Sequence, residues 1–198
     1  KYGRRPHLLV ILVGDNPASQ VYVKNKEKKA AEVGIKSTVI RLSKNVSENN
    51  LLEVIDEANA NISVDSILVQ LPLPNHINSN KVIDRISIEK DVDGFNSKNI
   101  GLLALGRPKV IPCTPLGCYK MLESILDLEG KKVIILGRSN IVGKPLSFLL
   151  TNKNATVTLA HSKSKNLQTD LILAELNFNS YLINGDFNKA KEFKFIAR

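Results

Sequence analysis

The chain has 198 residues, of which 43% are hydrophobic, and it carries a formal net charge of +9. This length provides for one large domain or two small ones with a substantial core, and the longest apolar runs are the size of strands, too short to cross a membrane. The lysines are spread along the chain and only 5% of residues are aromatic. The positive charge therefore fits an acidic small molecule or a phosphorylated cofactor as well as it fits nucleic acid.

Cysteine and histidine usage argues against two further kinds of site. Cys113 and Cys118 form neither a disulfide framework nor a Cys-x-x-Cys motif, which favours a reducing cytoplasm. The histidines His7, His76 and His161 are far apart and lack metal-ligand spacing. We therefore expect no metal centre.

The first predicted element is a run of branched apolar residues, Leu8–Val13, which is typical of a strand buried on both faces. A turn leads into a polar helix that Gly34 is placed to end. Tyr22 and Lys26 share one face of this helix, and Ser19 lies one turn earlier, at the cap or in the first turn. Ligands bind beyond the carboxyl ends of strands in open α/β sheets, so these side chains are candidate site residues. A solvated surface lysine is the alternative interpretation of Lys26.

Strand and helix signals alternate through the rest of the first half. Strands are predicted at 37–42 and 66–70, and helices at 48–58, capped by Ser47, and at 79–86. This order predicts a parallel sheet with right-handed crossovers.

The third predicted strand ends in Gln70-Leu71-Pro72-Leu73-Pro74. The two prolines cannot join a central ladder, so the strand must stop there. Gln70 offers both a donor and an acceptor to a ligand at the carboxyl end of the strand. A solvated glutamine at a strand exit is the alternative.

A tight loop is predicted at Lys90-Asp91-Val92-Asp93-Gly94-Phe95. Calcium binding does not fit, because no further carboxylates complete a calcium loop. An aspartate here could accept hydrogen bonds from the amino and ring N–H groups of a heterocycle. A turn-forming aspartate is the alternative interpretation.

A helix predicted from Thr114, as N-cap, to about Leu126 is a candidate connection between two halves, with Pro115 at its first position. We expect Cys113, just before it, to be a small buried residue, because no partner base is identifiable.

The second half opens with a buried strand, Val133–Leu136, followed by a turn that resembles the dinucleotide-binding pattern G-x-G-x-x-G. Gly137, Ser139 and Val142 stand at the three glycine positions, so only the first glycine is kept. A helix at 146–150 and a strand at 156–160 follow. Backbone N–H groups at the helix start could hold a pyrophosphate.

The residues after that second strand indicate which dinucleotide the turn accepts. Folds that prefer NAD place an acidic residue there to bind the ribose hydroxyls. This chain has His161-Ser162-Lys163 instead, and Arg138 lies in the first turn. The pattern therefore favours NADP.

Several motifs occur together in an order that resembles one known family. They are VGDNPASQVYVKNK, ILVQLPLP, EKDVDGFN with Asn99-Ile100-Gly101, PCTPLG, and GRSNIVGKP followed by HSKSKN. They span residues 8–166, and through them the chain resembles the bifunctional methylenetetrahydrofolate dehydrogenase/methenyltetrahydrofolate cyclohydrolase family.

The resemblance implies an α/β fold, with an N-terminal parallel α/β catalytic domain (1–112) and a Rossmann-type NADP-binding domain (113–198) joined by a long helix. It implies folate bound between the domains, NADP-dependent oxidation of 5,10-methylenetetrahydrofolate, and hydrolysis of the methenyl product to 10-formyltetrahydrofolate. Members are usually cytoplasmic homodimers in one-carbon metabolism, which supports purine biosynthesis. Tetrahydrofolate derivatives are the implied partners, with no nucleic acid and no membrane.

The resemblance also assigns roles to residues. Lys26 would be the main catalytic group, Tyr22 would stack on the pterin and support the lysine, Gln70 would hydrogen-bond Lys26, and Asp93 would bind the pterin amino and ring nitrogens. These four are the expected catalytic residues; the substrate-binding residues are Ser19, Tyr22, Gln70, Leu71, Pro72 and Asp93, and the cofactor-binding residues are Thr114, Gly137, Arg138, Ser139, Val142, His161 and Ser162.

The ends of the chain depart from the family pattern. The family's opening strand and helix do not precede Lys1, and its glycine-rich PVPGGVGP loop does not appear. Thr169–Ala174 resembles the next Rossmann strand and Leu182–Asp186 resembles a later turn, and these family-like fragments adjoin without the helices that a parallel sheet needs between its strands. We therefore expect residues to be missing between Gln168 and Asp186; a degenerate homologue with impaired cofactor closure is the alternative.

Two other function classes remain open from the sequence. One is a non-catalytic homologue that only binds or dimerises. The other is a basic nucleic-acid-binding protein, which would show salt-dependent binding to mixed oligonucleotides.

Overall fold

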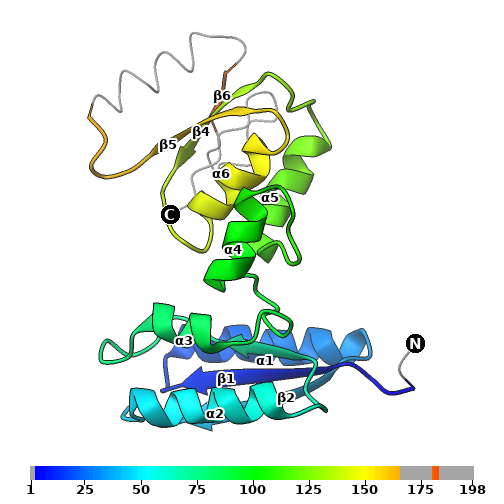
Figure 1. Cartoon of the computed structure of the whole chain (residues 1–198), viewed down its shortest axis with the longest axis vertical. Helices are drawn as coiled ribbons and strands as arrows, with labels where there is room; N and C mark the ends of the chain where they lie inside the picture. The colour runs from blue at the N-terminus through cyan, green and yellow to red at the C-terminus, as the bar shows by residue number, and fades with distance from the viewer. Residues whose placement is uncertain (1–2, 166–179, 183–198) are drawn as a thin grey trace. The chain divides into compact units, whose positions relative to one another are not determined.

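The computed structural model describes residues 3–165 and 180–182. The chain divides into two compact units between Lys98 and Asn99 (Figure 1), which we call unit 1 (1–98) and unit 2 (99–198). The described strands form one parallel sheet in each unit. The predicted α/β class with parallel sheets is therefore confirmed.

Unit 1 is a parallel sheet with the strand order β2-β1-β3. Leu9 and Ile11 of the central strand pack in one cluster with Leu51 of the second helix. Val10, from the same strand, packs in another cluster with Val23 of the first helix. The apolar run is therefore buried on both faces, as predicted. The elements are β1 (His7–Val13), α1 (Pro17–Glu32), β2 (Lys36–Leu42), α2 (Glu48–Ala60), β3 (Ser66–Val69) and α3 (Ser79–Arg85).

Short polar residues fix the ends of the helices in unit 1. Asn16, rather than Ser19, caps α1: its side-chain oxygen accepts a hydrogen bond from the N–H of Ser19 at 3.1 Å. Ser47 caps α2 as predicted, accepting from the N–H of Asn50 at 3.1 Å. Gly34 follows the end of α1 with a φ of +79°, the left-handed conformation that favours glycine there.

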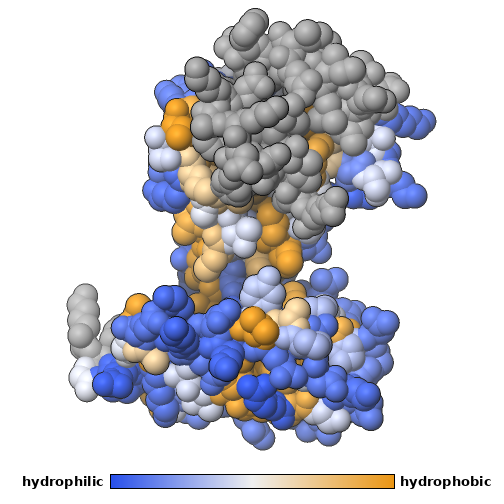
Figure 2. Space-filling model, turned by 180° about the vertical axis from the view of Figure 1, so that it is seen from behind, coloured by the Kyte–Doolittle hydropathy of each residue, from blue (hydrophilic) through white to orange (hydrophobic). Residues whose placement is uncertain are grey.

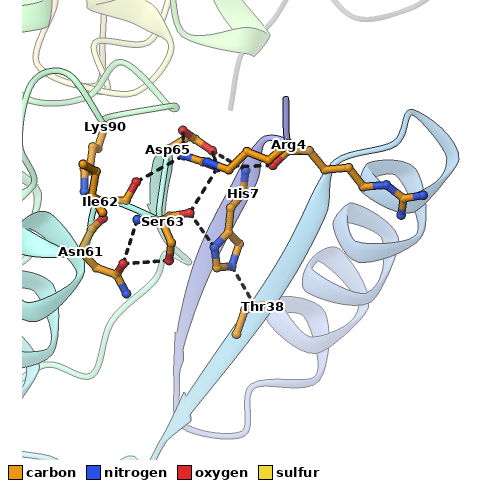
Figure 3. Close-up of polar contacts among 9 residues, drawn as sticks. Arg4, His7, Thr38, Asn61, Ile62, Ser63, Asp65 and Lys90 are labelled. Carbon is orange, nitrogen blue, oxygen red and sulfur yellow. Dashed lines mark hydrogen bonds and ion pairs between the residues drawn. The ribbon is translucent and has the colours of Figure 1, made fainter. Parts of the chain in front are cut away.

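A polar network lies at the amino ends of β1 and β3 (Figure 3). The Arg4 guanidinium pairs with both oxygens of the Asp65 carboxylate, at 2.6 and 2.8 Å, and that carboxylate accepts from the N–H of His7 at 2.7 Å. The His7 ring bridges the Ser63 carbonyl and the Thr38 hydroxyl, at 3.0 and 2.9 Å. This network joins the α2–β3 loop to the start of β1, at the edge of the sheet opposite to the strands' carboxyl ends.

Unit 2 has the strand order β5-β4-β6, again parallel. Val133 and Ile135 of its central strand pack with Leu122 and Leu146, from two different helices, in one core cluster. The elements are α4 (Ser97–Ala104), which spans the division between the units, α5 (Cys113–Glu123), β4 (Lys132–Leu136), α6 (Gly143–Thr151), β5 (Thr156–Ala160) and β6 (Ser180–Leu182).

The helix predicted as the connection between the halves is present as α5, but the connection also includes α4. It is divided between α4 and α5, and Gly106, at φ +72°, and Pro108 lie between them and interrupt the helical path. Thr114 is the second residue of α5 rather than its N-cap; Pro112 takes that place and accepts from the N–H of Leu116 at 3.0 Å. Pro115, predicted at the first position, is the third residue of α5; a proline is tolerated there because the N–H groups of the first turn lack helical partners. Cys113 is exposed, not buried as expected, because it opens the helix.

Two predictions concern the organisation of the chain. The resemblance predicts a domain boundary at 112/113, and the chain divides into its compact units at 98/99. The expected break between Gln168 and Asp186 lies outside the described residues apart from β6, and so does the strand-like fragment Thr169–Ala174.

Candidate active site

The first group of candidate residues stands on α1, which begins just beyond the carboxyl end of β1. Ser19 is buried in the first turn, at 3% exposure, whereas the Tyr22 side chain is largely in solvent, at 62%. Lys26 is half-buried and Lys28 is exposed. The helix therefore separates one partly enclosed lysine from its solvated neighbours, which argues against Lys26 as ordinary surface charge.

Lys26 and Gln70 are brought together from α1 and the end of β3. The ammonium of Lys26 donates to Oε1 of Gln70 at 3.2 Å. The Gln70 amide donates in turn to the Leu71 carbonyl at 2.7 Å, which fixes which end of the amide faces the lysine. The backbone N–H of Gln70 donates to the Ile11 carbonyl at 2.9 Å. The hydrogen bond that the resemblance implied is thus present, and Leu71 and Pro72, joined by a cis peptide bond, follow directly.

Asp93 is a third member of this group. Its carboxyl is half-buried, and burial raises its pKa above the ordinary value, opposed by the positive charge of Lys26 and reinforced by the negative charge of Asp91. The carboxylate therefore senses the ammonium across the site. Among the candidates of unit 1, the structure brings Lys26 and Gln70 into direct contact, whereas among the described residues it shows no hydrogen bond of the Ser19 or Tyr22 side chain with this pair.

The two aspartates of the predicted tight loop have different tasks. Asp91 is buried, at 3% exposure, and its carboxylate accepts from the N–H groups of Gly94, Phe95 and Asn96 at 3.1, 3.3 and 2.9 Å. The turn-forming interpretation is therefore correct for Asp91. It leaves Asp93, at the tip of the loop, as the carboxyl available to a ligand.

In unit 2 the dinucleotide-like turn follows β4 directly. Gly137 has a φ of +125° and donates to the Ala160 carbonyl at 2.7 Å, so this turn lies beside the end of β5. The Ser139 hydroxyl accepts from the N–H groups of Val142 and Gly143 at 3.1 and 3.2 Å, and its carbonyl accepts from Lys144 at 3.1 Å. The N–H groups expected to hold a pyrophosphate are therefore already paired with Ser139.

Gly143, which the sequence pattern did not single out, is the residue that this turn most requires. A Cβ atom at this position would lie 2.2 Å from the Gly137 carbonyl oxygen. Glycine is needed here because the strand and the helix approach closely. In dinucleotide-binding folds, the third glycine of the pattern allows the same approach. The sequence offered one indication of this role: a glycine, Gly143, stands one position after Val142, the residue aligned with the third glycine of the pattern.

The remaining cofactor candidates lie in this turn, after β5 and on α5. Arg138 and Ser162 are exposed, and His161 is half-buried after β5. The ring Nδ1 of His161 accepts from the N–H of Lys163 at 3.1 Å, and Ser164 closes the same turn by accepting from the N–H of His161 at 2.9 Å. Thr114 is exposed in the first turn of α5. Basic and hydroxyl side chains thus gather where an acidic residue would select NAD.

The surface and the rest of the described residues are consistent with such a site. Figure 2 shows that the visible face of unit 1 is mostly hydrophilic. No helix in residues 3–165 or 180–182 is long and apolar enough to cross a membrane. The same described stretches contain no group of three or more His, Cys, Asp or Glu residues that could hold a metal ion.

Comparison with known proteins matches both parts of the chain to domains of one family. Residues 1–93 match the tetrahydrofolate dehydrogenase/cyclohydrolase catalytic domain, and residues 112–178 match the NAD(P)-binding domain of that family. The chain is 50% identical to the bifunctional protein FolD of Streptococcus agalactiae over 195 residues, covering 96% of this chain and 68% of the relative.

Solved structures agree. The bifunctional FolD enzyme of Campylobacter jejuni, a methylenetetrahydrofolate dehydrogenase/cyclohydrolase, superposes with a TM-score of 0.83 at 48% identity, over 91% of this chain and 63% of that one. The Trypanosoma brucei enzyme, solved with NADP and an inhibitor, gives 0.82 at 36% identity, over 91% and 60%. The chain thus spans about two thirds of the length of these relatives. Motifs, fold and comparisons converge, and the chain belongs to the tetrahydrofolate dehydrogenase/cyclohydrolase family.

Proposed function

We propose that the protein oxidises 5,10-methylenetetrahydrofolate with NADP and hydrolyses the methenyl product to 10-formyltetrahydrofolate. The observation that carries this proposal is the hydrogen bond from the Lys26 ammonium to the Gln70 side chain at 3.2 Å, with the half-buried Asp93 carboxyl on the loop between α3 and α4. These groups lie at the carboxyl edge of the sheet, where ligands bind in α/β folds.

Folate binding rests on the polar groups of unit 1. The half-buried Asp93 carboxyl would accept hydrogen bonds from the amino and ring N–H groups of the pterin. Tyr22, with its ring exposed, would stack on the pterin face. Ser19, Leu71 and Pro72 complete the expected substrate-binding set.

The two reactions make different demands on these residues. In the first, a hydride leaves the carbon that bridges N5 and N10, and the positive charge spreads over both nitrogens; this step needs alignment more than a base. In the second, water adds to that carbon, a proton is lost, and the bond to N5 breaks as N5 gains a proton. Lys26, oriented by Gln70, is placed to move these protons.

NADP fits the residues of unit 2. Because Gly143 has no Cβ, its backbone can approach the Gly137 carbonyl as closely as a dinucleotide-binding turn requires. Arg138, with Ser162 and His161 after β5, would receive the 2′-phosphate, and Gly137, Ser139, Val142 and Thr114 would surround the rest of the dinucleotide. When bound, NADP supplies the acceptor for the hydride.

The proposal extends to the protein's setting. We place it in the cytoplasm as a homodimer in one-carbon metabolism that serves purine biosynthesis, with two domains divided near 112/113 and with folates rather than nucleic acids or membranes as partners. Family membership favours this over a non-catalytic homologue.

The direct test is an absorbance assay of the full-length protein with 5,10-methylenetetrahydrofolate and NADP. We expect NADPH to form and the methenyl compound to be consumed by hydrolysis. Binding of NADP without either reaction would overturn the proposal and favour the non-catalytic homologue.

A further inference from the structure

The loop that carries Asp93 is anchored to unit 1 at its beginning. The carbonyl of Lys90 accepts from the N–H of Ile67 at 2.7 Å, and Asp91 forms a parallel bridge with Ile67 of β3. The Lys90 ammonium donates to the carbonyls of Ala58, Asn59 and Asn61 at 3.0, 2.8 and 2.8 Å, at the C-terminal end of α2. Positive charge is favourable at that end of a helix. The entry to the loop therefore cannot shift without breaking these contacts.

The other end of the loop is anchored by Asn96, which is buried at 3% exposure. Its side-chain amide donates to the carbonyl of Ile86 at 2.9 Å, just after α3. Its side-chain oxygen accepts from the N–H of Lys98 at 2.9 Å. The loop is thus held between α2 and α3, and only the residues between the anchors are free to choose a conformation.

The carboxylate of Asp91 decides that conformation. One of its oxygens accepts from Gly94 and Phe95, and the other accepts from Asn96. The chain must therefore curl around the carboxylate, and Gly94, at φ +71°, makes the curl possible. Val92 and Asp93 are left at the outer part of the curl, where Asp93 feels the charge of Lys26.

We propose that Asp91 is a positioning residue, whose carboxylate folds the loop around itself and so holds Asp93 in place beside the Lys26–Gln70 pair. The inference rests on the proposed function only in that Asp93 binds the folate. Asp91 touches no reacting atom; it acts through Asp93. A merely structural role would instead cost stability without changing folate kinetics.

The test compares Asp91→Asn with a matched control, Asp65→Asn. Asp65 is also a carboxylate in unit 1 that accepts a backbone N–H, from His7, but it lies at the amino edge of the sheet. An asparagine at position 91 has one acceptor oxygen for three N–H groups, so the loop must open. We expect kcat/KM for the folate substrate to fall about 100-fold, the cost of a small misplacement of a binding group, with the Kd for NADP unchanged. The control should lose stability and keep its folate kinetics.

A second variant, Asp91→Ser, is tested in case Asp91→Asn does not fold. Its hydroxyl can still accept one N–H, and it buries no amide group. It should show the same kinetic pattern as Asp91→Asn. Normal folate kinetics in a folded Asp91 variant, with a loss of thermal stability no different from that of the control, would overturn the inference.

A second measurement separates this inference from the proposed function. NMR titration of the Asp93 carboxyl needs no folate turnover. The titration of this carboxyl should change in Asp91→Asn, because the neighbouring negative charge, the burial of Asp93 and its interaction with Lys26 all depend on Asp91 and the closed loop, and it should be unchanged in Asp65→Asn. An unchanged Asp93 titration in Asp91→Asn would overturn the inference even in an active enzyme. A wild-type protein without folate activity would overturn only the proposed function.

Discussion

At the scale of single residues, the strongest prediction concerns Lys26. Lys26→Gln keeps a polar side chain of similar reach that cannot carry protons. We expect the cyclohydrolase rate to fall by about 10²–10⁴, the range that general acid–base groups supply, and the dehydrogenase rate to fall less, because hydride transfer depends on alignment. Both rates should be measured for each variant, with folding checked by thermal melting.

The matched control is Lys28→Gln, on the same helix but exposed. It should change neither rate appreciably. Equal losses from the two substitutions would mean that Lys26 acts only as surface charge.

Arg138 carries the prediction about cofactor choice. Arg138→Ala removes an exposed guanidinium from the turn after β4, and charge-assisted hydrogen bonds of the kind proposed for the 2′-phosphate contribute about 1.5–3 kcal/mol. The Kd for NADP should therefore rise about 10- to 100-fold, and the Kd for NAD should hardly change. Fluorescence titration of both dinucleotides measures this. Equal or tighter binding of NAD by the wild-type protein would contradict the preference for NADP.

At the scale of elements, we expect alanine substitutions at two glycines, one in the turn between β4 and α6 and one on α5, to change the stability in opposite directions. Gly143→Ala places a Cβ against the Gly137 carbonyl, and we expect a loss of about 1–3 kcal/mol of stability together with weaker NADP binding. Gly117→Ala, on α5, meets no atom within 4 Å and should stabilise the helix by up to about 1 kcal/mol. Thermal melting curves and NADP titrations of both variants measure these changes in stability and in cofactor binding. A neutral Gly143→Ala would show that the turn can move apart freely.

Most elements followed from the sequence because their signals are local. The apolar run of β1, the Ser47 cap of α2 and Gly34 after α1 each depend on a few neighbouring residues. Asn16 was missed as the cap of α1 because Ser19 offered an equally good cap chemistry three residues later. The helix predicted from Thr114 to about Leu126 is present as α5, but its bounds are Cys113–Glu123, because Pro112 and Pro115 suit either the cap or the first turn and their spacing does not fix where the helix begins.

The candidate site followed less completely. The Lys26–Gln70 contact could be anticipated from the resemblance alone, since the residues are far apart in sequence. The separate tasks of Asp91 and Asp93 could not, because they depend on which carboxylate turns inward to the backbone. Gly143 escaped because a spacing pattern does not report the approach of its Cα to a carbonyl oxygen.

At the scale of the whole molecule, three of the ion pairs between described residues of unit 1 are expected to affect its acid stability. Arg4, Lys81 and Arg85 lower the pKa values of Asp65, Glu48 and Asp56, mainly through side-chain hydrogen bonds. Two of these pairs, Glu48–Lys81 and Asp56–Arg85, join α2 to α3. A lowered folded-state pKa gives stability that is present above the unfolded value and is lost as pH falls through the folded value. All three pairs are solvent-exposed, so each contribution is small and screened by salt.

We therefore expect the free energy of unfolding to decrease as pH falls below about 4.5, less steeply in the double variant Glu48→Gln/Asp56→Asn. Glu53→Gln, an exposed residue of α2, serves as control and should follow the wild type. Urea titrations between pH 6 and 3 measure these slopes. The same slope in the double variant and the wild type would show that the α2–α3 ion pairs do not contribute to acid stability.

The half-buried carboxyl of Asp93 has a consequence for the thermodynamics of ligand binding. A ligand that donates N–H groups to this carboxyl stabilises its ionised form, so binding must release protons at pH values between the pKa of the bound and of the free protein. Folate affinity should accordingly rise with pH through that interval and level off above it. Calorimetry of folate binding in two buffers of different ionisation enthalpy counts the released protons directly. The release should vanish in Asp93→Asn, which makes proton uptake and release a signature of a correctly seated pterin.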